Sequence, residues 1–112
     1  MDLFLTICET VRRSIEHSVA LGRKMDCVKN TDREFDILEP EDIVMVNSGI
    51  SNGQKIRLYS AAQEKGTAVF SMPDDCTNGA ACVTVKHRFP FISHIKRELR
   101  VYERLCSKGL VL

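Results

Sequence analysis

The stretch PFISHIKRELRVYERLCSK, residues 90–108, carries the clearest structural pattern in the chain. Apolar side chains recur in it at steps of three and four residues, which places them on one side of an α-helix: Ile92, Ile95, Leu99, Tyr102 and Cys106. Pro90 suits an early helical position, and Gly109 suits the position after the end. We therefore expect an amphipathic C-terminal helix over 90–108 that packs on one face of a sheet.

The other side of this predicted helix is basic. Between residues 86 and 108, seven lysines and arginines are opposed only by Glu98 and Glu103. Arginine suits bidentate contacts to carboxylate or phosphate, so we expect a basic row on this helix to bind a partner, with help from the outer face of the sheet. The candidate binding residues are Lys96, Arg97, Arg100, Arg104, Lys108, Lys55, Arg57 and Lys86. The alternative is that the row is only the solvated face of an amphipathic helix.

Short segments with strand character fill residues 43–87. Ile43 to Val46 is rich in β-forming residues, and 55–59 alternates polar with apolar residues as a half-buried strand does. Asn52-Gly53 is a dipeptide that tight hairpin turns favour, so we expect a hairpin between these two strands. The prediction is a four-stranded antiparallel meander with strands at 43–46, 55–59, 67–72 and 82–86.

Upstream of this sheet, the sequence predicts a first helix and an acidic connector. The helix covers residues 3–24, where apolar residues recur at helical steps and Asp2 can cap the first turn. Residues 26–42 hold seven acidic and two basic residues, and Pro40 disfavours a helix there. We expect this connector to offer an acidic counter-surface, which would meet the basic helix within one molecule or in a second copy; its members are Glu39, Glu41 and Asp42.

Length and composition complete the expected fold. The chain has 112 residues, 44% of them hydrophobic, with a formal net charge of +1. These values are typical of one globular domain and argue against disorder or a wholly basic, histone-like binder. No repeat or linker divides residues 1–112, so the prediction is a single α+β domain whose two helices cover one face of the sheet.

Five cysteines, an odd number with irregular gaps, do not indicate a disulfide framework. The longest apolar runs are only a few residues, far short of the roughly 20 that cross a bilayer, and Arg12 and Arg13 interrupt any secretory signal. We therefore expect free thiols in an intracellular protein of the cytoplasm or the nucleus. Cys76 and Cys82 are separated by five residues, which is not the spacing of a zinc site, so we expect no metal.

The segment Gly49–Gly53 begins and ends with glycine, which is also frequent in phosphate-binding loops. Such a loop ends in Gly-Lys-Ser/Thr and leads into a helix, whereas here Gln54 and Lys55 follow Gly53 and a strand is predicted next. We therefore expect a hairpin turn there, and no cofactor or small-molecule substrate.

Three functions fit the sequence to different degrees. The leading hypothesis is a non-enzymatic interaction domain of the accessory, adaptor or matrix type, which self-associates and presents its basic helix to a protein partner. The second is an RNA-binding module, because a helix, antiparallel strands and a basic helix are the elements of a double-stranded-RNA-binding domain. The same basic helix would also suit an anionic membrane surface. That domain's usual Lys-Lys-x-Ala-Lys start is missing here, where Phe91 and Ile92 stand instead. The third is a cysteine-dependent enzyme around Cys82 and His87.

Overall fold

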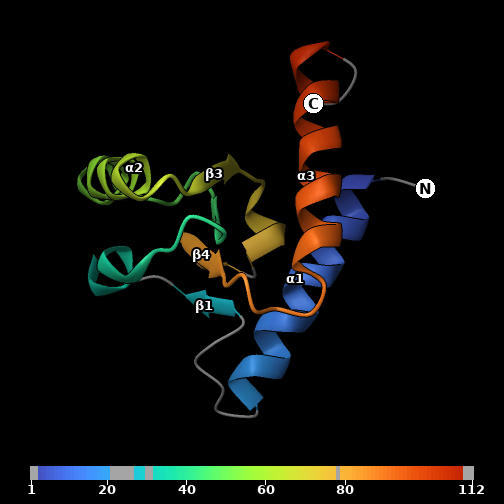
Figure 1. Cartoon of the computed structure of the whole chain (residues 1–112). Helices are drawn as coiled ribbons and strands as arrows, with labels where there is room; N and C mark the ends of the chain where they lie inside the picture. The colour runs from blue at the N-terminus through green and yellow to red at the C-terminus, as the bar shows by residue number, and fades with distance from the viewer. Residues whose placement is uncertain (1–2, 21–26, 30–31, 78, 110–112) are drawn as a thin grey trace.

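A computed structural model describes residues 3–20, 27–29, 32–77 and 79–109; the side chains of 3–4, 18–20, 27–29, 32–34 and 74–75 lie outside the description. This part of the chain forms a small α+β domain with three α-helices and a mixed sheet (Figure 1). In chain order its elements are α1 (Leu3–Ala20), β1 (Cys27–Lys29), the 3-10 helix η1 (Asp32–Ile37), β2 (Ile43–Val46), α2 (Asn52–Lys65), β3 (Ala68–Ser71), the 3-10 helix η2 (Asp74–Thr77), β4 (Cys82–Val85) and α3 (Ile92–Ser107).

The sheet is built on β3, β2 and β4, and the three-residue strand β1 extends it beyond β4. β2 lies parallel to β3, with Ile43 opposite Ala68, and antiparallel to β4, with Ile43 opposite Val85. The predicted antiparallel meander is therefore wrong: α2 carries the chain from β2 to β3, and a crossover of this kind returns the chain parallel.

The predicted strand at 55–59 lies inside α2. Ser51 caps the helix by accepting a hydrogen bond from the Gln54 backbone N–H, and Gly66 ends it in the left-handed conformation, with φ +72°. Asn52-Gly53 accordingly forms the first turn of a helix and not a hairpin. The alternation at 55–59 was misleading because Ile56, one of its apolar residues, is 69% exposed, while Leu58 is buried.

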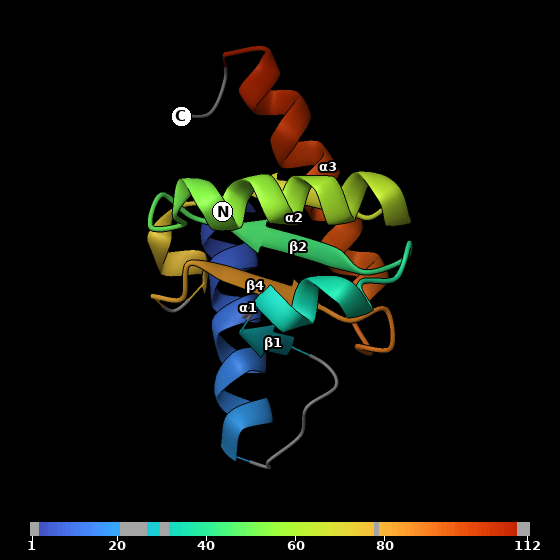
Figure 2. The same cartoon turned by 90° about the vertical axis from the view of Figure 1, so that its left-hand side faces the viewer.

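Helices cover both faces of the sheet, which explains why β2 and β4 are buried at every position. Figure 1 shows α2 on one side of the strands and α1 with α3 on the other, and Figure 2 shows α2 and η1 in front of the sheet. Val83 and Val85 face α1 and α3, whereas Cys82 joins the cluster beneath α2. The two predicted helices, α1 and α3, thus lie together on one face as expected, but the opposite face, expected to be an open outer face, is covered by α2 and η1.

The helix at the C-terminal end of the described chain agrees with its prediction. Ile95, Leu99 and Tyr102 are buried in the core that α3 shares with α1, and Ile92 and Cys106 pack against that core. Gly109 follows the helix with φ +74°, a conformation that glycine adopts without strain. The Asp2 cap and the predicted last turn of the first helix, at 21–24, lie outside the described residues.

Two features correct the predictions for the cysteines and the connector. A disulfide joins Cys8 on α1 to Cys76 on η2, so the thiols are not all free. Among the described residues, Cys82 and Cys106 are outside any disulfide, and Cys82 is buried. Within the connector, 27–29 forms β1 and 32–37 forms η1, so the acidic stretch is partly folded into the domain.

Candidate functional site

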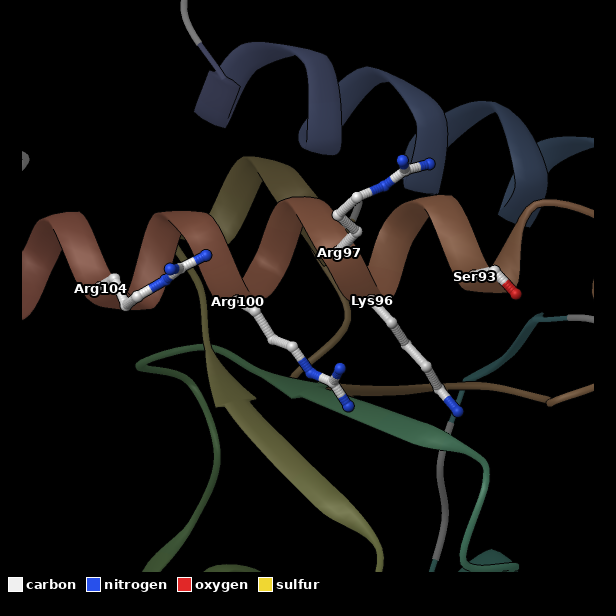
Figure 3. Close-up of a pocket in the computed structure, with 5 residues that line it drawn as sticks. All are labelled: Ser93, Lys96, Arg97, Arg100 and Arg104. Atoms are coloured by element: carbon white, nitrogen blue, oxygen red, sulfur yellow. The ribbon is translucent and has the colours of Figure 1, made fainter.

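The basic face of α3 surrounds an open depression of about 540 Å³ (Figure 3). The residues that line it all come from this helix, and their spacing of three and four places them on one side of it. They are Ser93, Lys96, Arg97, Arg100 and Arg104. We refer to these five residues as the basic face. Ser93 was missed in the sequence, although its distance of three and four residues from Lys96 and Arg97 follows the same helical rule.

The side chains of the basic face spread in several directions. Arg97, Arg100 and Arg104 are exposed, and Lys96 is half-buried. In Figure 3, Arg97 extends toward the side where α1 lies, while Lys96 and Arg100 extend to the opposite side, over the strands. The cations therefore border the depression on both sides, and a partner that enters it would meet positive charge across its width.

No carboxylate in the described part of the chain lies within 4.0 Å of the cationic groups of Lys96, Arg97, Arg100 or Arg104. Glu98, the nearest acid in sequence to Arg97, is instead 2.9 Å from His94. From Arg97 to Arg104 the helix rises about 10 Å, roughly the distance over which physiological salt screens charge. These like charges repel one another, so an anion bound between them would relieve the repulsion.

The other predicted binding residues do not join the basic face. Lys108, at the end of α3, is exposed and lies one turn beyond Arg104. Lys55 and Arg57 lie on α2, across the sheet from α3 (Figure 1). Lys86 is buried, and its ammonium contacts groups inside the protein.

Lys86 is held by an ion pair with Asp42. Its Nζ lies 2.6 Å from Asp42 Oδ2 and donates to the Ile37 carbonyl at 3.3 Å. Burial alone would raise the pKa of Asp42. The hydrogen bond from Lys86 and the backbone N–H groups of His87 and Glu39 outweigh burial, and the pKa is lowered below its ordinary 3.8. This pair joins the residue before β2 to the residue after β4 and so helps to hold these neighbouring ends of the two strands together.

The acidic counter-surface is largely engaged within the domain. Glu39 Oε2 lies 3.0 Å from His87 Nδ1, and its other oxygen lies 3.6 Å from Lys86 Nζ. Asp42 is fully buried, so of the three predicted members only Glu39 and Glu41 are exposed. Oxygen and nitrogen atoms of Glu39, Asp42 and His87 lie within 4.8 Å of one another. This donor set would suit a cation, but the ammonium of Lys86 already supplies the positive charge there.

Cys82 and His87, the pair predicted for nucleophilic catalysis, lie toward opposite ends of one strand. Burial raises the pKa of Cys82 to about 12, so its thiol stays protonated at neutral pH and is a poor nucleophile. Cys82 begins β4 and lies opposite Val46, whereas His87 follows the other end of that strand. Cys76, the remaining cysteine in this region, is held in the disulfide.

None of the helices in the described part of the chain has the length and apolar character that a membrane crossing requires. No family model, curated protein or solved structure matches the chain.

Proposed function

We propose that this protein is a non-enzymatic interaction domain whose basic face binds an acidic surface of a partner protein. One observation carries the proposal: three arginines and a lysine border one depression, and no described carboxylate pairs with them. Cations left without partners on one side of a helix give a surface that is electrostatically complementary to clustered carboxylates.

A protein partner fits this surface better than a nucleic acid does. The depression is lined by the aliphatic stems of Lys96 and the arginines as well as by their charged ends. Arginine is enriched at protein interfaces because it combines apolar contact with bidentate hydrogen bonds. The RNA alternative rested on two helices flanking an antiparallel sheet, and the mixed sheet with α2 on its second face departs from that arrangement.

Self-association of head-to-tail copies is the weaker part of the original hypothesis. It needs the acidic connector of one copy to meet the basic face of another. Glu39 and Asp42 already contact Lys86 and His87, which leaves Glu41 as the predicted acidic residue with no such contact. The proposal therefore names a different protein as the partner and makes the oligomeric state an outcome of its test.

The test compares two variants that lose the same charge. One is Arg97→Gln, Arg100→Gln and Arg104→Gln, on the basic face. The matched control is Arg13→Gln on α1 with Arg57→Gln and Lys65→Gln on α2, all at exposed positions outside the basic face. The probe is poly-L-glutamate, and binding is measured at low and high salt beside an RNA duplex and anionic vesicles.

We expect the basic-face variant to fold normally and to lose about tenfold or more in affinity for poly-L-glutamate, while the control loses little. High salt should mimic the loss, because it screens exposed charges. Equal losses in the two variants would mean that net charge, and not the basic face, drives binding. Tighter binding to the RNA duplex would reassign the surface to nucleic acid, and a mass above that of the monomer without any probe would restore self-association.

A further inference from the structure

A second depression, which shares no lining residue with the basic face, lies where two parallel strands end. β2, α2 and β3 form a parallel crossover, so β2 ends at Val46 and β3 ends at Ser71 on the same edge of the sheet. Open α/β arrangements place ligands beyond the carboxyl ends of such strands. A depression of about 510 Å³ lies at this edge, which is within the size range of small-molecule sites.

The walls of this depression come from both layers of the fold. α2 contributes Lys55 and Tyr59, and α3 on the other side of the sheet contributes Tyr102. Apolar residues that follow the strands, Met72 and Pro73, add to its lining. Two tyrosines from different elements, apolar neighbours and a few polar groups form the composition that small organic ligands meet in proteins. Tyr59 is 41% exposed, which leaves its ring accessible to a ligand.

The loop that borders the depression is held in one conformation. Asn47 is buried; its Nδ2 donates to Thr77 Oγ1 at 2.7 Å and to the Ala80 carbonyl at 2.6 Å. Its Oδ1 accepts from the Gly49 backbone N–H at 2.7 Å. A Cβ at Gly49 would lie 3.0 Å from that oxygen, so glycine suits this position. A loop that is ordered before binding saves the ligand the entropy cost of ordering it.

The charge of the lining selects the class of ligand. Lys55 is the one ionisable side chain among the lining residues apart from the two tyrosines, and no carboxylate lines the depression in the described part of the chain. Lys55 also lies in the first turns of α2, whose N-terminal end carries a partial positive charge. The site would therefore attract one anionic group, and the exposed ring of Tyr59 offers a face on which a planar group can stack.

We propose that this depression binds a small molecule that carries a planar ring and one anionic group, either a phosphate monoester or a carboxylate. The sequence argued against a phosphate-binding loop on two grounds, the missing Gly-Lys-Ser/Thr ending and a strand predicted after Gly53. The structure removes the second ground, since a 14-residue helix follows instead, and the site proposed here does not need the first. This site is separate from the basic face and does not depend on the function proposed for it.

The proposal is tested by titrating isotopically labelled protein with four probes and following the backbone amide resonances. The probes are adenosine 5′-monophosphate, adenosine, inorganic phosphate and benzoate. We expect the shifts to fall on residues 47–55, 71 and 72, with adenosine 5′-monophosphate or benzoate binding more tightly than adenosine or phosphate. The stronger of these two probes identifies the anionic group.

Matched variants then locate the contacts. Lys55→Gln should weaken binding about tenfold, whereas Arg57→Gln, which removes the same charge from the same helix outside the depression, should change it little. Tyr59→Ala should weaken binding and Tyr59→Phe should retain it, because phenylalanine keeps the ring. Shifts confined to residues 93–104, equal effects of the Lys55 and Arg57 variants, or no shifts at millimolar concentrations of any probe would overturn the proposal.

Discussion

The two faces of the sheet are covered in different ways. On the α1 and α3 side, the core is a large apolar cluster to which both helices contribute several buried residues, among them Val11, Ile15, Ile95 and Leu99. On the other side, α2 contributes only Leu58 and Ala62 to a smaller cluster with Phe35 and Leu38. The Asp42–Lys86 ion pair adjoins this smaller cluster.

This difference shows what keeps each helix in place. α3 has a continuous apolar stripe, so burial alone fixes its orientation and leaves the opposite side free to carry charge. α2 has little apolar surface to bury, and its ends are defined locally by the Ser51 cap and by Gly66. We therefore expect substitutions beneath α3 to unfold the domain, and those beneath α2 to weaken it by smaller steps.

The largest effect is expected at the centre of the α3 stripe. Leu99 is fully buried, so Leu99→Asp would place an unpaired carboxylate in the apolar core. The cost should be about 5 kcal/mol or more, comparable to the whole stability of a small domain. Arg100→Ala, the adjacent exposed position, is the control and should melt close to the unmodified protein. Equal thermal stability of the two variants would contradict the placement of α3.

The next effect concerns the buried ion pair. Asp42→Asn keeps the shape of the side chain but leaves Lys86 without its carboxylate at 2.6 Å, which should cost about 3–5 kcal/mol in the free energy of unfolding. The same group gives the protein an acid sensitivity. Because the native pKa of Asp42 is lowered, its contribution is complete above the ordinary value of 3.8 and is lost as the pH falls through the native pKa.

Denaturant titrations at a series of pH values measure both consequences. The difference in stability between the unmodified protein and Asp42→Asn should be constant near neutral pH and should shrink below about pH 4. A difference that stays the same down to the acid transition would show that Asp42 is not the group responsible.

Leu58 is the one large buried side chain that α2 itself contributes to the core. Leu58→Ala should cost about 2–4 kcal/mol, because it removes buried methyl groups and leaves a cavity. Ile56→Ala, two residues earlier and 69% exposed, should change stability by less than about 0.5 kcal/mol. Urea titration of the two variants distinguishes α2 from the strand that the alternation at 55–59 predicts, because a strand would hold Ile56 and Leu58 on the same face and similar losses at both positions would contradict the helix.

The smallest effect is expected at the start of α2. Ser51→Ala removes the side-chain acceptor for the Gln54 N–H and should cost about 1 kcal/mol. Ser51→Asp should retain most of the stability, because an aspartate oxygen can accept the same hydrogen bond. If Ser51→Ala and Ser51→Asp have the same midpoint in urea, the cap does not stabilise α2.

The sequence predicted part of the fold from periodicity. Residues 92–107 and 3–20 have apolar stripes long enough to identify helices, and both are confirmed. At 55–59 the pattern covered only five residues, and a window of that length fits a strand and a helix equally well. The strand predicted at 82–86 is also confirmed as β4, with Val83 and Val85 on one face and Cys82 on the other. The burial of Lys86 could not be predicted from the sequence, because its partner Asp42 is 44 residues away in the chain.

Local sequence, by itself, determined the amphipathic helices, the strands at 43–46, 68–71 and 82–85, and the row of cations on α3, because each depends on neighbours within a few turns. Tertiary structure alone decided the parallel pairing of β2 with β3, the cover on the second face, and the Cys8–Cys76 disulfide. It also decided which charges stay available: Asp42 and Lys86 neutralise each other inside the domain, while the basic face has no such partner among the described residues. These outcomes depend on contacts between residues far apart in the chain, and no local pattern records such contacts.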